Sequence, residues 1–315
     1  MKRKDKAMSR EQMLGTAYAG PMGVWFTLFF TIPLGIIILY SFLKRGLYGG
    51  VEWKFSLLAY KQMFNPSFAK VLVRTLWISV VSTVICILLA LPAGYAMAKS
   101  KHQTLLLFLI IIPFWTNSLI RIYAWISILS SEGFLNNVLI GLHLIKEPLH
   151  MIYNNGSVIL VLVYMYLPFA ILPLFTTIDK FDFSLLDAAR DLGATKLEAI
   201  NLVMIPNIKS GISTAIIFTF IPIFGAYTVP LLVGGKESTM IGNIIVDQVS
   251  KTRNWPLASA FSIVLTVISL IGVFWMLNTG RHEKLAQSKN SATSQSELES
   301  SVADHHMRNK SEESK

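Results

Sequence analysis

Six long apolar runs set the strongest constraint on the structure of this chain. They cover residues 22–43, 76–97, 104–120, 157–178, 212–233 and 257–277. Each is close to the ~20 residues that an α-helix needs to cross the hydrocarbon core of a bilayer. Hydrophobic residues make up 53% of the chain, so these runs cannot all be buried in one soluble core. The sequence therefore predicts an all-α membrane protein with six transmembrane helices.

The charges between the runs predict the topology. The segment 1–17 is basic and resembles the start of a signal sequence, but the run 22–43 is too long to be the apolar part of one. We therefore expect a retained first helix that starts in the cytoplasm. Lys99 and Lys101 mark an inner turn, whereas the five basic residues of 44–70 oppose the usual bias for an outer loop. Six spans then place both termini and the loop after the fourth run in the cytoplasm.

This predicted topology divides the chain into three segments. Residues 1–17 form a cytoplasmic basic N-terminus, and residues 18–279 form the six-helix transmembrane domain. Residues 280–315 are rich in Ser, Lys, Glu and Asn and poor in apolar residues, so we expect a disordered cytoplasmic tail.

Composition and missing motifs exclude several functions. The net charge of +10 lies outside the apolar runs, where it is explained by topology and lipid headgroups and not by nucleic acid. Gly234-Gly235-Lys236 is followed by Glu237, so no phosphate-binding loop for ATP is formed. The histidines form no zinc-protease pattern, and no nucleophile elbow of serine hydrolases is present. We expect neither an enzyme nor a resident metal or cofactor.

The apolar runs contain no Asp or Glu. Ion-coupled secondary transporters usually place a carboxylate at membrane depth, because a group there must bind the coupling ion. The absence of such a carboxylate indicates that energy for any transport comes from another polypeptide.

The most informative soluble stretch is the loop 183–206. Ser184 with Asp187, and Thr195 with Glu198, are each spaced as a capping box that starts a helix. Gly193 lies between them, where a glycine ends a helix in the left-handed conformation. Pro206 is expected to end the second helix. The loop is therefore predicted to be a short helix, a sharp turn and a second helix, and Leu185, Leu186, Ala189 and Leu192 fall on one face of the first helix.

The same loop carries a resemblance to a known family. Asp187, Ala188 and Ala189, then Gly193, then Val203-x-Ile205-Pro206 are similar in type and spacing to the "EAA" loop of importer-type ATP-binding-cassette (ABC) permeases. Asp187 replaces the family's Glu, Val203 its Ile, and Ile205 its Leu. The resemblance implies a type I ABC importer permease fold, in which this loop is the coupling helix that docks on the ATPase. Asp187, Ala188, Ala189, Gly193 and Pro206 are then the candidate ATPase-coupling residues.

The resemblance also implies partners. It predicts a second homologous permease, a dimer of ABC ATPases that holds ATP and Mg, and an extracellular or periplasmic substrate-binding protein. This chain would be a multi-pass protein of the bacterial inner membrane, and ATP binding by the partner would drive alternating access.

A second resemblance concerns the transported solute. The segment 113–123, PFWTNSLIRIY, and segments 186–196 and 240–256 are similar to those of spermidine/putrescine permeases of the ABC class. A chain without intramembrane carboxylates can pass a polycation over aromatic faces, because each cation–π contact contributes roughly 0.5–2 kcal/mol. The candidate pathway residues lie near predicted helix kinks: Trp115, Tyr123, Tyr164, Tyr166 and Tyr227. The fifth run is expected to be interrupted by Pro222, Gly225 and Pro230, and carbonyl groups freed by the two prolines are expected to assist these aromatic residues.

Two alternatives remain open. The first is an ABC importer permease for another solute, such as sulfate, iron or another small solute. The acid-free spans and Arg121, which we expect to snorkel at the outer interface, suit an anion at least as well as a polyamine. The other alternative is a channel or scaffold that works without an ATPase.

Overall fold

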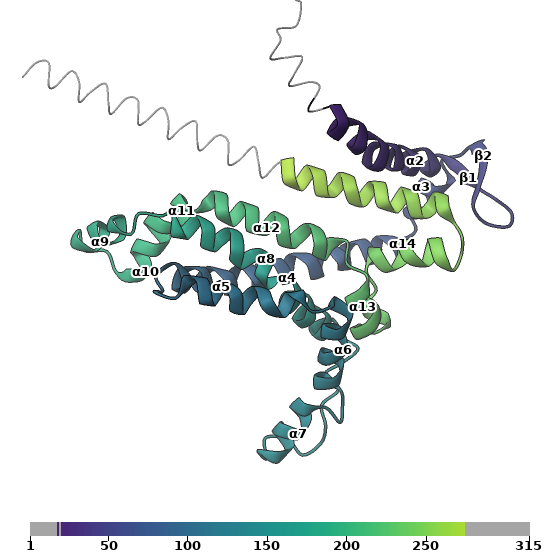
Figure 1. Cartoon of the computed structure of the whole chain (residues 1–315). Helices are drawn as coiled ribbons and strands as arrows, with labels where there is room; N and C mark the ends of the chain where they lie inside the picture. The colour runs from purple at the N-terminus through teal and green to yellow at the C-terminus, as the bar shows by residue number, and fades with distance from the viewer. Residues whose placement is uncertain (1–17, 19, 275–315) are drawn as a thin grey trace, which may run out of the picture. The chain divides into compact units, whose positions relative to one another are not determined.

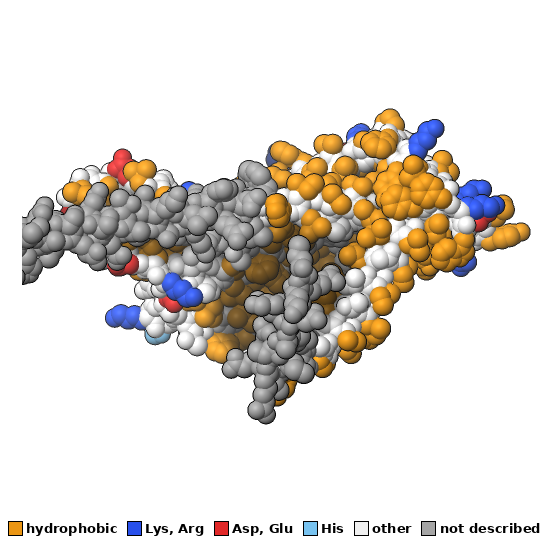
Figure 2. All heavy atoms as spheres, turned by 90° about the horizontal axis from the view of Figure 1, so that it is seen from above, with side chains coloured by type: hydrophobic (Ala, Val, Ile, Leu, Met, Phe, Trp, Pro, Cys, Tyr) orange, Lys and Arg blue, Asp and Glu red, His pale blue; other side chains and the backbone are white. Residues whose placement is uncertain are grey.

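A computed structural model describes residue 18 and residues 20–274 of the chain. The predicted N-terminal segment 1–17 and the predicted tail 280–315 lie outside the described residues. The described chain is almost entirely helical (Figure 1), with one two-stranded sheet. Hydrophobic side chains cover much of the face seen in Figure 2, and the charged side chains there gather in a few separate groups.

Four helices are long and apolar enough to cross a membrane, and they match four of the predicted runs. They are Gly20–Ser41, α4 (Pro66–Ala98), α8 (Asn155–Asp179) and Trp255–Phe274. Two bent pairs bring the number of spans to as many as six: 103–115 with 118–141, and 196–207 with 209–224. The protein therefore has the all-α membrane architecture that the sequence predicts.

The chain divides into two compact units. The first comprises residues 1–79, 122–159 and 224–267, and the second comprises residues 80–121, 160–223 and 268–315. The long helices α4 and α8 contribute residues to both units.

The first unit begins with the helix Gly20–Ser41, which contains a π-helical turn, η1 (Thr27–Thr31), followed by α2 (Ile32–Ser41). A hairpin follows, in which β1 (Leu43–Arg45) pairs antiparallel with β2 (Val51–Phe55). The remaining elements are α3 (Leu58–Met63), α7 (Phe134–Gly141), α13 (Thr228–Val233), η4 (Lys236–Ser238), α14 (Ile241–Ser250) and most of Trp255–Phe274. Its core includes a cluster of Ile241, Ile244, Leu257 and Phe261.

The second unit contains the loop that the sequence singles out. Its elements are α5 (Gln103–Ile111), η2 (Ile112–Trp115), the first residues of α6 (Ser118–Leu129), α9 (Ser184–Asp191), α10 (Lys196–Ala199), η3 (Ile200–Met204), α11 (Ile205–Asn207) and α12 (Lys209–Phe224). Gly94 of α4 lies against α8, where an added Cβ would be 3.3 Å from the backbone nitrogen of Phe175.

The predicted third span, 104–120, is wrong as a continuous helix. The helical path ends after Trp115 and resumes at Ser118, and the two helices meet at 91°. Asn117 causes the new start, because its Oδ1 accepts a hydrogen bond from the Leu119 backbone nitrogen at 2.8 Å. Pro113 lies inside the short 3₁₀ turn before the break.

The predicted fifth span, 212–233, is also interrupted. The helix α12 starts earlier, at Lys209, and ends at Phe224, and α13 begins only at Thr228. Pro222 is accommodated inside α12. The three residues 225–227 form the actual break, so the predicted interruption is confirmed at Gly225 and is wrong at Pro222.

Candidate functional site

The turn between α9 and α10 is built on Gly193. Its φ angle is +96°, and no atom lies within 4 Å of the position that a Cβ would take. The Gly193 backbone nitrogen donates to the Arg190 carbonyl at 2.9 Å, and the Ala194 nitrogen donates to the Ala189 carbonyl at 3.1 Å. This pair of bonds is the Schellman motif, which satisfies the last carbonyls of a helix and requires a left-handed residue. The sequence prediction for Gly193 is confirmed.

The capping box at the start of α10 is confirmed as well. Thr195 Oγ1 accepts the backbone N–H of Glu198 at 3.3 Å, and Glu198 Oε2 accepts the backbone N–H of Thr195 at 2.8 Å. The backbone hydrogen bond from Thr195 lowers the pKa of the Glu198 carboxyl below its ordinary value. A lowered pKa means that the cap is lost only when the pH falls through that value, so the cap is intact at neutral pH.

The predicted cap at Ser184 is wrong. The helix α9 begins at Ser184 itself, and the preceding residue, Phe183, makes no side-chain cap. The Ser184 backbone nitrogen instead donates to Asp182 Oδ1 at 3.0 Å. Hydrogen bonds from Ser184 lower the pKa of Asp182, so this turn too is formed at neutral pH. Asp187 is left on the surface, 3.9 Å from Arg190 Nη1.

Pro206 does not end the second helix. The path runs through α10, the π-helical η3 and α11, and Pro206 lies in the first turn of α11. The helical path ends at Asn207 and turns by 73° into α12.

The loop exposes apolar side chains that its own fold does not cover. Leu186 is buried, but Leu185, Leu192, Leu197 and Leu202 are exposed, and Leu192 reaches 91%. Of the apolar face predicted for the first helix, Leu186 therefore faces the interior, whereas Leu185 and Leu192 are exposed. Ala188 is exposed and Ala189 is half-buried on α9. Exposed leucines on a charged loop are typical of a docking surface for another protein.

A polar groove lies beside these leucines. It is lined by Asp187, Arg190, Asp191, Ala194, Thr195 and Lys196, and so runs between α9 and α10. The α9–α10 pair lies at one end of the second unit, beyond the ends of α8 and α12 (Figure 1).

The base of the loop is held by an aromatic cluster of Tyr95, Lys99, Phe181 and Phe183. The Lys99 ammonium lies 4.9 Å from the Phe183 ring centroid and 5.2 Å from that of Tyr95. Phe181 and Phe183 meet edge to face at 5.6 Å. Beside this cluster, Gln103 Nε2 donates to Asp179 Oδ1 at 3.0 Å. The turn after α4 and the end of α8 therefore hold the loop together, a role for Lys99 that sequence reasoning missed.

The five candidate pathway residues are divided between the two units. Trp115, Tyr164 and Tyr166 belong to the second unit, and Tyr123 and Tyr227 belong to the first. Trp115 and Tyr123 are well exposed. Tyr164 lies 6.1 Å from Phe114, and Tyr166 lies 6.1 Å from Phe169, as measured between ring centroids. The structure thus adds Phe114, which the sequence offered within the motif 113–123.

Tyr227 occupies the helix break and is held there by α14. Its side chain is 45% exposed, while its carbonyl accepts a 2.8 Å hydrogen bond from Asn243 Nδ2. Asn243 is buried, and its Oδ1 also accepts the Met240 backbone N–H at 3.1 Å. At Gly242 an added Cβ would lie 2.7 Å from the Ala226 carbonyl oxygen. The motif 240–243 therefore positions the break through Asn243 and Gly242, which the sequence analysis did not assign.

Arg121, which the sequence places at the end of an apolar run, contacts an aromatic ring. Its guanidinium carbon lies 4.3 Å from the Phe114 ring centroid, a cation–π contact. The side chain is half-buried, and among the described residues its Nε and Nη1 have no hydrogen-bond partner. Arg121 therefore packs on an aromatic ring, and its snorkelling at the outer interface stays a prediction.

Comparison with known proteins defines the class of protein. A family model described as "Binding-protein-dependent transport system inner membrane component" matches residues 86–281. The chain belongs to this family. It is thus a transport permease subunit and not an enzyme, and it is a multi-pass inner-membrane protein.

Particular relatives are similar over most of their length. The spermidine/putrescine transport system permease protein PotB of Escherichia coli (strain K12) is 39% identical over 255 residues, which cover 80% of this chain and 93% of that protein. The protein of the same name from Haemophilus influenzae is 38% identical over 252 residues, covering 79% of this chain and 88% of that protein.

A solved structure supports the fold. One chain of the crystal structure of a bacterial alginate ABC transporter, in complex with an alginate pentasaccharide-bound periplasmic protein, superimposes with a TM-score of 0.72. The sequence identity is 15%, and the match covers 87% of this chain and 96% of that chain. The type I ABC importer permease fold expected from the sequence is therefore the fold of this chain.

Proposed function

We propose that this chain forms half of the translocation pathway of an ABC importer for polyamines of the spermidine and putrescine type. The single observation that carries the solute class is the 39% identity, across 93% of its length, to a permease named for spermidine and putrescine transport. The motif 113–123 supports the same class, because it supplies Phe114 and Trp115 as aromatic faces for a cation.

The loop 183–206 is the proposed coupling element to an ATPase dimer that holds ATP and Mg. Asp187, Ala188, Ala189, Gly193 and Pro206 shape it, and the exposed leucines and the polar groove offer both apolar and charged contacts to a partner. ATP binding by the partner moves this loop as a rigid body and changes which side of the membrane the cavity faces.

Two further partners complete the proposed assembly. A second homologous permease supplies the other half of the pathway, and a substrate-binding protein delivers the solute. The match to a transporter that was crystallised with its periplasmic protein supports the latter. In this assembly the N- and C-termini and the coupling loop face the cytoplasm, in keeping with Lys99 and Lys101 at the inner turn.

Tyr227 is the proposed gate residue of the pathway. It is half-exposed at an unwound segment whose backbone is fixed by Asn243, an arrangement typical of the broken helices that line transport sites. Trp115, Tyr123, Tyr164 and Tyr166 are proposed as further aromatic faces. Weak contacts suit transport, because a tightly held solute would not be released.

Tyr227→Ala is expected to lower spermidine uptake about tenfold with an unchanged amount of assembled complex, because loss of one desolvated cation–π contact weakens binding by roughly 1–2 kcal/mol. Uptake of labelled spermidine into proteoliposomes that contain the whole complex measures this effect. Tyr227→Phe keeps the ring and serves as the matched control with nearly normal uptake. Normal uptake by the alanine variant would remove Tyr227 from the pathway.

An anion importer is the second candidate, and Arg121 is the observation that favours it. A half-buried guanidinium with unpaired Nε and Nη1 among the described residues is suited to bind an oxyanion. Arg121→Gln should abolish uptake of an anion. By contrast, it should change polyamine uptake by about twofold at most, because removing a positive charge does not disfavour a cation. Competition of labelled spermidine by unlabelled putrescine and by sulfate, measured on the same proteoliposomes, decides between the two.

A further inference from the structure

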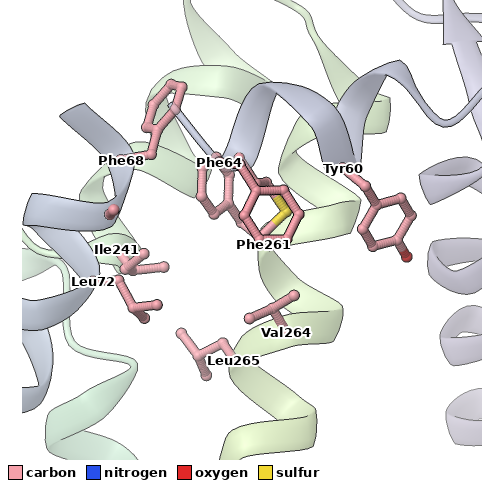
Figure 3. A pocket seen from close by; sticks show the side chains of 10 residues that line it. Tyr60, Phe64, Phe68, Leu72, Ile241, Phe261, Val264 and Leu265 are labelled. Carbon is pink, nitrogen blue, oxygen red and sulfur yellow. The ribbon is translucent and has the colours of Figure 1, made fainter. Parts of the chain in front are cut away.

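The first unit contains an apolar cavity that the proposed transport cycle does not use. It has a volume of about 310 Å³, at the lower end of the range of small-molecule sites. Its lining comes from α3, the start of α4, α14 and the Trp255–Phe274 helix: Tyr60, Met63, Phe64, Phe68, Ala69, Leu72, Ile241, Phe261, Val264 and Leu265. Figure 3 shows these side chains around an open space.

The cavity has almost no polar groups with which a water molecule could form hydrogen bonds. Tyr60 carries the only polar side-chain group in the lining, and its hydroxyl turns away from the space (Figure 3) and donates to Ser41 Oγ at 2.9 Å. A water molecule needs two to four polar partners to be stable in a cavity, and an apolar cavity stays dry or takes an apolar guest.

The surroundings identify the apolar guest. Both α4 and the Trp255–Phe274 helix are among the four helices able to cross a membrane. Their outer surfaces therefore meet hydrocarbon chains, and Phe64, 86% exposed, lies at the rim of the cavity. A lipid acyl chain is the hydrocarbon that is available to enter from this side.

Two exposed lysines, Lys61 and Lys70, are sequence neighbours of residues that line the cavity. Lys61 is next to Tyr60 on α3, Lys70 is next to Ala69 near the start of α4, and both are exposed. Within the described part of the chain, neither forms an ion pair, whereas Lys44 and Lys54 in the neighbouring hairpin both pair with Glu52, at 3.7 and 2.7 Å. Unpaired lysines at the end of a membrane helix attract the phosphate of an anionic lipid.

We infer that this cavity is a binding site for an anionic phospholipid, with one acyl chain between Phe64, Leu72, Phe261 and Leu265 and the phosphate near Lys61 and Lys70. The lipid holds α3 against the first turns of α4 and the last span. It also contacts Ile241, the first residue of α14, which is the helix that carries Asn243. This inference does not depend on the solute and is tested without a transport measurement.

The test uses the full chain in nanodiscs with equal amounts of phosphatidylglycerol and phosphatidylcholine. Native mass spectrometry after release into detergent counts the lipids that remain bound. The wild type should retain one phosphatidylglycerol in preference to phosphatidylcholine. Lys61→Gln with Lys70→Gln should lower this preference about fivefold per lysine removed. Val264→Trp, which fills the cavity, should remove the retained lipid of either kind.

Lys44→Gln with Lys54→Gln is the matched control. It removes the same charge from the same region, but from two lysines that are held by the carboxylate of Glu52, so the preference should change little. The inference is overturned if the wild type retains the two lipids equally. It is also overturned if both lysine pairs have the same effect, or if Val264→Trp retains phosphatidylglycerol as the wild type does.

Discussion

Replacing Gly193 by valine is expected to lower solute-stimulated ATP hydrolysis by the assembled transporter about tenfold. The φ angle at this turn is +96°, where a β-branched residue is strained, and an L residue there costs about 1–2 kcal/mol. That energy shifts an equilibrium by roughly 5–30-fold. An added Cβ meets no neighbour, so the expected effect comes from the backbone and falls on the angle between α9 and α10. ATPase assays with and without the binding protein measure it.

Two variants isolate this effect. Gly193→Asn should retain most of the stimulation, because asparagine tolerates the left-handed region. Gly50→Val introduces the same kind of strain, since Gly50 has a φ of +75° and equally open surroundings, but it lies in the hairpin between β1 and β2. The hairpin variant should couple normally. If Gly193→Val reduced the amount of complex as much as its activity, the loop would be a folding element and not a coupling element.

The long apolar helices and the coupling turn could be predicted because their causes are local. A run of some 20 apolar residues has one stable arrangement in a bilayer. The Gly193 turn and the box at Thr195 and Glu198 depend on residues within a few positions of each other. The capping box predicted from the spacing of Ser184 and Asp187 is nevertheless wrong, because the Ser184 backbone nitrogen donates to Asp182 Oδ1 instead.

The interruptions of the spans were predicted less well, because proline is a poor guide to them inside a membrane. Pro92, Pro168, Pro173 and Pro222 all lie within continuous helices. Neighbouring helices and side chains can satisfy the carbonyl groups that these prolines free. The breaks lie at Asn117, which the sequence did not indicate, and at Gly225, which it did.

Contacts between residues distant in the sequence could not be predicted at all. Asn243 donates to the Tyr227 carbonyl, and the Ile241 backbone nitrogen donates to Thr75 Oγ1 at 2.9 Å across 166 positions. Neither pairing has a sequence signal, because each depends on how whole helices pack. The same holds for the stacking of Arg121 on Phe114, which required the unforeseen bend between them.

A second large effect is expected at Gly211, where the two helices that carry the coupling loop touch. The loop leaves α8 at Asp179 and enters α12 at Lys209, so Thr177 and Gly211 lie at its two ends. A Cβ at Gly211 would lie 2.6 Å from the Thr177 Cβ. Thr177 cannot simply rotate away, because its hydroxyl donates to the Pro173 carbonyl at 2.8 Å.

Gly211→Val is therefore expected to separate α8 from α12 and to lower uptake at least tenfold, since overpacking of this kind costs about 1–3 kcal/mol. Motion of the loop then no longer reaches both helices together. Adding Thr177→Gly to Gly211→Val provides space for the new side chain on the other helix and should restore part of the uptake, less about 1 kcal/mol for a glycine inside α8. Gly272→Ala, at a helical glycine with open surroundings, is the control and should leave uptake unchanged. An equal loss in the single and the double variant would show that close contact between α8 and α12 is not what the coupling loop requires.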